Sequence, residues 1–176
     1  MSPAALLSLS DRLDRISTVI GRNVAWLGLG LVLVTFVVVI VRYLFDSGSI
    51  ALQESALYLH ATLFMLGAAW TLKIDGHVRV DVFYRHFSLR GKAIADLVGT
   101  LVFLLPTCGF LLWISQDYVD AAWRVREASP EAGGLPFVYL LKTLIPVTAV
   151  LLILQGFSQL LRRLGELLQP AGSTHG

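Results

Sequence analysis

The sequence has few charged residues and only one cysteine. Charged residues make up 15% of its 176 residues, whereas hydrophobic residues make up 56%, a composition far more apolar than that of ordinary soluble domains. The lone Cys108 excludes a disulfide within the chain, so cysteine usage does not indicate the compartment. The sequence also lacks the residue patterns of nucleophilic, zinc-protease and phosphate-binding active sites. We therefore predict a membrane protein that is not an enzyme and that has no nucleic-acid partner.

The charged residues gather in clusters that leave four long runs without any charge. Each run reaches the roughly 18 residues that a helix needs to cross a hydrocarbon core about 30 Å thick, and the runs are residues 24–41, 55–72, 97–116 and 143–161. Backbone polar groups in lipid must be satisfied within the segment, and the alternating pattern of a membrane barrel is missing. The predicted fold class is therefore all-α integral membrane.

We expect a single membrane domain over residues 1–176, with transmembrane helices over about 23–44, 53–73, 93–116 and 137–162. Lys and Arg residues favour the cytoplasmic side of a membrane protein and therefore predict its orientation. Ten of the 14 lie in or beside the N-terminal segment, the middle loop and the C-terminal tail, whereas Arg42, Arg124 and Arg126 lie in the two other loops. Both chain ends and the middle loop are thus predicted to be cytoplasmic.

A helix of a different character is predicted before the first run. Between residues 5 and 22, apolar residues recur at spacings of three and four, while acidic and basic residues fall on the other side. This pattern predicts an amphipathic helix at the membrane interface. Its apolar stripe lies either in the headgroup boundary or against a membrane helix of a partner. The stripe consists of Leu6, Leu9, Leu13, Ile16 and Ile20.

Two charged residues flank the short loop between the first and second predicted spans. Arg42 ends the first span and Glu54 begins the second, so both should lie at a similar depth near the outer interface. We expect an ion pair that clamps this hairpin. The alternative is that each side chain reaches separately to water, as long side chains at helix ends do readily.

His60 is the one histidine inside a predicted span. We expect its side chain to face protein, because an ionisable group is costly in lipid. A haem held between two spans would need a second histidine within the membrane. His77, His86 and His175 all fall outside the predicted spans, so no haem or other cofactor is expected.

Small and amide side chains mark possible helix contacts. Gly28 stands at the centre of a stripe with Gly21 and Thr35, at seven-residue intervals, where another helix could approach closely. Gln155 and Gln159 lie one turn apart on the fourth span. They either form hydrogen bonds across a helix interface or bond to backbone within their own helix.

The loops offer interaction surfaces. In the middle loop, His77, Arg79 and Asp81 are candidate contacts with a partner at the cytoplasmic face, and the acidic and histidine residues there match no established metal-ligand spacing. The loop from Asp117 to Gly134 contains Pro and Gly residues that predict irregular, exposed structure. It is either a docking surface or a solvated connector.

Several short motifs together resemble one known family. They are Arg42-Tyr43-Leu44-Phe45, Leu52-Gln53-Glu54, Phe64-Met65-Leu66-Gly67-Ala68-Ala69, the segment Asp75 to Tyr84, Gly133-Gly134-Leu135-Pro136, Lys142-Thr143-Leu144-Ile145-Pro146 and Leu154-Gln155-Gly156. The chain resembles the small, DctQ-type membrane subunit of tripartite ATP-independent periplasmic (TRAP) transporters, most closely the mannitol/chloroaromatic/2-oxo-acid-like branch. The likeness extends over nearly the whole chain.

This resemblance implies a division of labour in the bacterial inner membrane. A periplasmic binding protein captures an organic acid or related solute, a large membrane subunit carries it together with sodium by an elevator motion, and the small subunit is a scaffold. The alternative from a different class is a four-helix membrane anchor of a haem- or quinone-linked respiratory complex. That alternative is weakened by the missing second histidine within the membrane.

Overall fold

The computed structural model describes residues 2–77, 84 and 86–168, and in this part of the chain it contains helices and no strand. The helices are α1 (Pro3–Ala25), α2 (Leu27–Leu44), α3 (Ile50–Lys73), α5 (Leu89–Val98), the π-helical η1 (Gly99–Leu104), α6 (Leu105–Val125) and α7 (Val138–Leu168). Four helical segments are long and apolar enough to cross a membrane: Pro3–Leu44, Ile50–Lys73, Arg90–Val125 and Val138–Leu168. The predicted all-α fold with four spans is confirmed.

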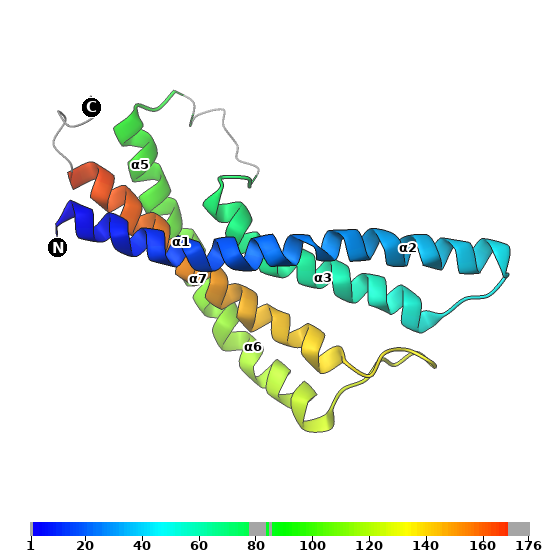
Figure 1. The fold of residues 1–176 in the computed structure, drawn as a ribbon. Helices are drawn as coiled ribbons and strands as arrows, with labels where there is room; N and C mark the ends of the chain where they lie inside the picture. The colour runs from blue at the N-terminus through cyan, green and yellow to red at the C-terminus, as the bar shows by residue number, and fades with distance from the viewer. Residues whose placement is uncertain (1, 78–83, 85, 169–176) are drawn as a thin grey trace.

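Two hairpins form the bundle, and α7 joins them. α2 packs against α3, α6 packs against α7, and α7 also contacts α1, α3, α5 and η1. In Figure 1 the two hairpins diverge toward their connecting loops, whereas the start of α1 and the end of α7 lie together at the opposite end of the molecule. The core is therefore concentrated where α1, α3 and α7 meet.

α1 and α2 are nearly one continuous rod. The residue between them, Trp26, has right-handed helical dihedrals (φ −65°, ψ −22°), and α1 continues the direction of α2 (Figure 1). The 42 residues of this rod would extend over about 63 Å, roughly twice the thickness of a hydrocarbon core. α2 alone, with 18 residues, matches the core at about 27 Å. Much of α1 therefore lies beyond the hydrocarbon.

The predicted N-terminal helix is present, and it packs within the chain mainly through a face other than the predicted apolar stripe. α1 buries Leu6, Ser10, Asp14, Ser17, Gly21 and Val24, whereas Leu9 and Ile16 of the expected apolar stripe are exposed. The reason is that α1 packs on α3 and α7 of its own chain. Small side chains permit this close approach, since a Cβ atom at Gly21 would overlap the side chain of Trp70 on α3.

Local sequence explains where several helices begin and where one changes form. Ser2, Ser49 and Ser88 are N-caps whose hydroxyl groups accept a hydrogen bond from the first turn of α1, α3 and α5, as serine does at helix starts.

The third span widens into η1 just before Pro106. Proline lacks a backbone N–H and its ring crowds the carbonyl one turn earlier, and a π-helical turn accommodates both effects.

Candidate functional site

A cluster of buried polar side chains joins α1 to α7, and we call it the polar junction. Its members are Ser10 and Asp14 of α1 with Gln155, Ser158 and Arg162 of α7. Ser10 and Ser158 are fully buried, Gln155 is 2% exposed and Asp14 is 6% exposed. Polar groups buried to this degree require partners. The junction supplies them for these side chains except at Gln155 Oε1, which is buried and accepts no hydrogen bond from the described residues.

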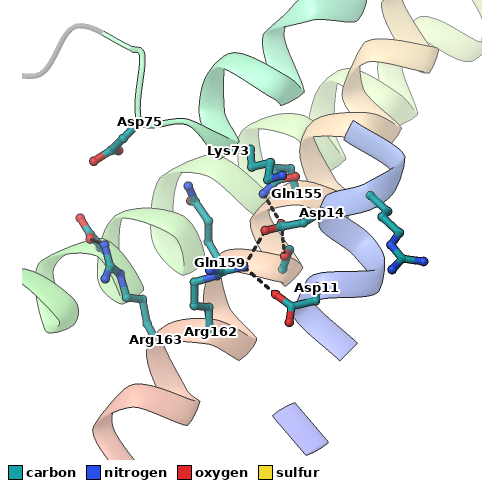
Figure 2. A pocket seen from close by; sticks show the side chains of 11 residues that line it. Asp11, Asp14, Lys73, Asp75, Gln155, Gln159, Arg162 and Arg163 are labelled. Atoms are coloured by element: carbon teal, nitrogen blue, oxygen red, sulfur yellow. Dashed lines mark hydrogen bonds and ion pairs between the residues drawn. The ribbon is translucent and has the colours of Figure 1, made fainter. Parts of the chain in front are cut away.

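Asp14 is the centre of the polar junction (Figure 2). Its Oδ1 accepts hydrogen bonds from Ser158 Oγ at 2.6 Å and from Gln155 Nε2 at 2.9 Å, and its Oδ2 accepts one from Arg162 Nη2 at 2.7 Å. Both carboxylate oxygens are thus satisfied from α7. Arg162 Nη2 also lies 3.1 Å from Oδ1 of the exposed Asp11.

The serine pair completes the arrangement. Ser158 Oγ lies 3.0 Å from both Ser10 Oγ and the Ser10 carbonyl oxygen. A hydroxyl group has one hydrogen, and the shorter, charge-assisted contact to Asp14 is the stronger bond. Ser158 therefore donates to Asp14, and Ser10 Oγ is left to donate to Ser158 Oγ.

Residue spacing brings these groups together. Positions 10, 14, 17 and 21 fall on one face of a helix, as do positions 151, 155, 158 and 162. Glycines allow the two helices to approach, because a Cβ at Gly165 would already lie 3.2 Å from Leu7. The polar junction is therefore a consequence of small residues alternating with polar ones on two facing stripes.

Further polar contacts extend the polar junction to α3 and α5. Lys73 Nζ at the end of α3 donates to Thr18 Oγ1 at 2.6 Å, and Gln159 Nε2 donates to the Leu72 carbonyl at 3.1 Å. Arg163 Nη2 pairs with Asp96 Oδ2 of α5 at 2.7 Å. Four helices are thus tied together at the end of the bundle that holds the start of α1 and the end of α7.

At the opposite end, Glu54 holds the loop between α6 and α7. Its Oε2 accepts a hydrogen bond from the backbone N–H of Leu135 at 2.5 Å, and its Oε1 accepts one from the hydroxyl of Ser129. Gly134 makes this approach possible, since a Cβ there would lie 2.5 Å from Ser129 Cβ and 2.9 Å from Glu54 Oε1. Glu54 therefore links the two hairpins.

The predicted ion pair between Arg42 and Glu54 is wrong. No ion pair joins them within the described ranges, and Arg42 is exposed. The prediction assumed that residues flanking one loop would pair across it. Instead, both oxygens of Glu54 accept hydrogen bonds from the loop of the other hairpin, so the carboxylate is satisfied without Arg42.

The other predicted residues lie in different surroundings. His60 is exposed on the surface of the chain and stacks on Phe64 with ring centroids 6.4 Å apart, so it does not face protein within this chain as expected. Gly28 packs α2 against α3, and a Cβ atom at this position would lie 3.7 Å from Leu63 Cδ2. His77 Nε2 lies 3.3 Å from the Ala68 carbonyl oxygen. Arg79 and Asp81 lie outside the described residues.

Of the expected contact residues, only Gln155 belongs to the polar junction. Asp14 was predicted to lie with the other charged residues opposite the apolar stripe of α1, and Ser10, Ser158 and Arg162 were not predicted as contact residues. A detectable pattern existed, because Ser10, Asp14, Ser17 and Gly21 repeat at spacings of three and four. Such a stripe of small and polar residues indicates a helix contact in a membrane protein.

Much of the apolar surface is left uncovered by the chain itself. α2 has no buried residue, and its outer face exposes large side chains such as Val32 and Phe36. The third span likewise exposes Phe103, Phe110 and Trp113. These faces suit lipid or the apolar surface of another membrane protein.

The comparison with known families is decisive. The family model described as "Tripartite ATP-independent periplasmic transporters, DctQ component" matches residues 31–166. The chain belongs to the DctQ family. No curated protein and no solved structure shows significant similarity to it.

Membership makes this DctQ chain the small subunit of a TRAP transporter and a multi-pass protein of the inner membrane. DctQ proteins are transporter components that work with a large membrane subunit and a periplasmic binding protein. The respiratory-anchor alternative is not favoured. In the DctQ chain, the residues in or near the polar junction are joined by hydrogen bonds and ion pairs that hold helices in place.

Asp14→Asn should release α1 from α7. The substitution removes the charge that pairs with Arg162 while keeping the size of the side chain. Asp14 is buried but the Arg162 side chain is 41% exposed, so we expect a loss of about 2 kcal/mol, between that of an exposed pair and that of a fully buried one. Thermal unfolding of the purified chain in detergent, with limited proteolysis of α1, measures the loss. Asp11→Asn is the matched control, because Asp11 shares Arg162 but is exposed, and an exposed pair is worth about 0.5 kcal/mol. Equal effects of the two substitutions would contradict the central place of Asp14.

Glu54→Gln should loosen the loop between α6 and α7. A glutamine side chain is uncharged and has one acceptor oxygen, whereas glutamate has two. The substituted side chain could therefore accept a hydrogen bond from the Ser129 hydroxyl or from the Leu135 N–H without the strength that the charge adds, and one of the two bonds would be lost. We expect protease cleavage after Arg126, measured in detergent, to become several-fold faster. Arg42→Ala should leave the cleavage rate unchanged. A comparable increase in Arg42→Ala would restore the ion-pair interpretation.

Proposed function

We propose that the chain is the static scaffold of its transporter, beside which the large membrane subunit moves during sodium-coupled uptake. The periplasmic binding protein delivers the solute, an organic acid or a related small molecule, as in the mannitol/chloroaromatic/2-oxo-acid-like branch that the motifs resemble. One observation carries the proposal: the helices are held to one another at both ends of the bundle, while the outer face of α2 has no cover within the chain.

The bonds at the two ends of the bundle favour a rigid scaffold over a moving part. At one end Asp14, Lys73 and Arg163 link α1, α3, α5 and α7. At the other end Glu54 links α3 to the loop before α7. Moving one hairpin against the other would break several of these partly buried, charge-assisted bonds together. A body of this kind provides a fixed surface against which a partner can slide.

The exposed face of α2 is the surface that we assign to the large subunit. Gly21 and Gly28 are used inside the chain, against Trp70 and Leu63 of α3, so these two positions of the small-residue stripe do not remain for a partner. The side of α2 next to Gly28 presents Leu29, Val32 and Phe36, each more than half exposed. Apolar packing of this kind drives helix association in membranes when shapes fit.

We place both chain ends and the middle loop in the cytoplasm, because ten of the 14 Lys and Arg residues lie on that side. The loops at Ser47 and Ser129 are then periplasmic. Single cysteines at Ser47 and at Ser8, in a background with Cys108→Ala, test this with a maleimide that does not cross membranes. We expect labelling of the Ser47 position in spheroplasts, and of the Ser8 position only after the membrane is broken. The reverse pattern would refute the orientation.

Co-purification and uptake test the scaffold role. A tagged chain, produced with the large subunit and extracted in mild detergent, should retain that subunit. Proteoliposomes should take up solute only when both membrane subunits, the binding protein and a sodium gradient are present. Phe36→Ala should lower the yield of the complex several-fold, whereas Phe103→Ala on the third span is the matched control. Uptake by the lone chain, or a chain that never retains the large subunit, would end the proposal.

A further inference from the structure

A line of exposed side chains runs along one face of α3, and we call it the α3 stripe. It consists of Gln53, Leu57, His60 and Phe64, which recur at the spacings of three and four that place residues on one side of a helix. All four are exposed, and Leu57 and Phe64 are each more than half exposed. Because Gln53 and His60 are polar, this surface differs from the apolar face of α2.

His60 lies near the middle of its span. α3 begins at Ile50 and has 24 residues, so it extends over about 36 Å and His60 lies about 15 Å from its start. A hydrocarbon core about 30 Å thick therefore surrounds His60 when α3 crosses the membrane. Among the described residues, the His60 ring stacks on Phe64 and has no hydrogen-bond partner.

Lipid tails do not satisfy an imidazole ring. A neutral imidazole has one donor and one acceptor nitrogen, and an unpaired polar group in an apolar medium is costly. Ionisable residues within membranes therefore almost always face protein or a water-filled cavity. Since the described part of this chain supplies no partner for His60, the polar group that it requires belongs to another protein.

The surface at the α3 stripe is hollowed toward both ends of the helix. A cavity of about 330 Å³ is lined by Gln53 and Leu57 near the start of α3. Another, of about 350 Å³, is lined by Phe64, Gly67 and Ala68 together with residues of α1. A Cβ atom at Gly67 would meet no atom within 4 Å, so the described chain leaves this space open. Small residues beside such a space allow the backbone of another helix to approach closely.

We propose that the α3 stripe binds a transmembrane helix of the large subunit and that this helix places a polar side chain opposite His60. The inference rests on the proposed function, because it takes the large subunit as the partner, and it adds a second contact surface to the face of α2. The polar side chain is a hydroxyl, amide or carboxylate group that forms a hydrogen bond with the imidazole ring. Apolar side chains before and after it fill the two cavities.

Two other occupants would cover the α3 stripe in a different way. A lipid acyl chain can lie in an apolar hollow, but it offers His60 no hydrogen bond. A second copy of this chain could pair with the stripe through a two-fold axis. The three occupants differ in whether a change in the stripe alters the affinity for the large subunit, alters self-association, or alters neither.

The affinity of the full chain for the purified large subunit, titrated in detergent micelles, tests the hydrogen bond. We expect His60→Leu to weaken binding about fivefold, which corresponds to about 1 kcal/mol and is within the range for hydrogen bonds between membrane helices. His60→Gln should retain most of the affinity, because an amide group also donates and accepts. If lipid covers His60, leucine should leave the affinity unchanged.

Gly67→Leu tests the space beside the stripe. The open space at Gly67 should accept leucine within the lone chain, whereas a closely packed partner helix would be overpacked and the affinity lowered about tenfold. Gly109→Leu is the matched control, because a Cβ atom at Gly109 of α6 also meets no atom within 4 Å. It should leave the affinity unchanged. Thermal unfolding of each lone variant shows that it remains folded.

The outcomes separate this inference from the proposed function. Unchanged affinity in folded His60→Leu and Gly67→Leu, together with weaker binding in Phe36→Ala, would overturn the inference and leave the scaffold role standing. A chain that never binds the large subunit would overturn both. Sedimentation of the lone chain measures self-association. If the two stripe variants lose self-association but keep their affinity for the large subunit, the stripe belongs to a second copy and the inference is wrong.

Discussion

The structure depends on the requirement that a buried carboxylate have partners. Asp14 is 6% exposed, and removing such a group from water without donors would cost several kcal/mol. Ser158, Gln155 and Arg162 supply those donors from three positions along α7. The register of α1 on α7 is thereby fixed, because a shift of one residue would take Asp14 away from all three. The small side chains on the facing sides of α1 and α7 are needed as well, because bulkier ones would hold the two helices too far apart for these hydrogen bonds.

Both ends of the bundle use acidic side chains to hold segments distant in sequence. Asp14 connects the first helix to the last, and Glu54 connects the second span to the loop before the fourth. Between these ends the helices meet through small residues, as where Gly21 accommodates Trp70 and Gly156 accommodates Leu104. Lipid-facing surfaces contribute little to holding the helices together, because lipid tails are as apolar as the side chains that they touch. The specific polar bonds therefore do much to determine one arrangement.

The four spans could be predicted from the sequence because the cost of charge in lipid is large and local. The partners of Asp14 and Glu54 could not, because they depend on how distant helices cross. Asp14 was grouped with Asp11, Arg12 and Arg15 opposite the apolar stripe because all four are charged, and only the other three are exposed. Arg42 was paired with Glu54 for proximity in sequence. The π-helical turn η1 is an intermediate case, because a proline within a span, here Pro106, indicates a distorted helix without indicating the form of the distortion.

The distribution of polar groups also bears on the division of labour in a TRAP transporter. A path for a charged solute needs polar groups that remain free to exchange partners as the solute passes. In the polar junction, the oxygens of Asp14 are filled by side chains of α7, and Ser10 is paired with Ser158. Such groups have little capacity left for cargo. Their arrangement instead supports a rigid body whose uncovered apolar faces are suited to lipid and to a membrane partner, which is what a scaffold beside a moving subunit requires.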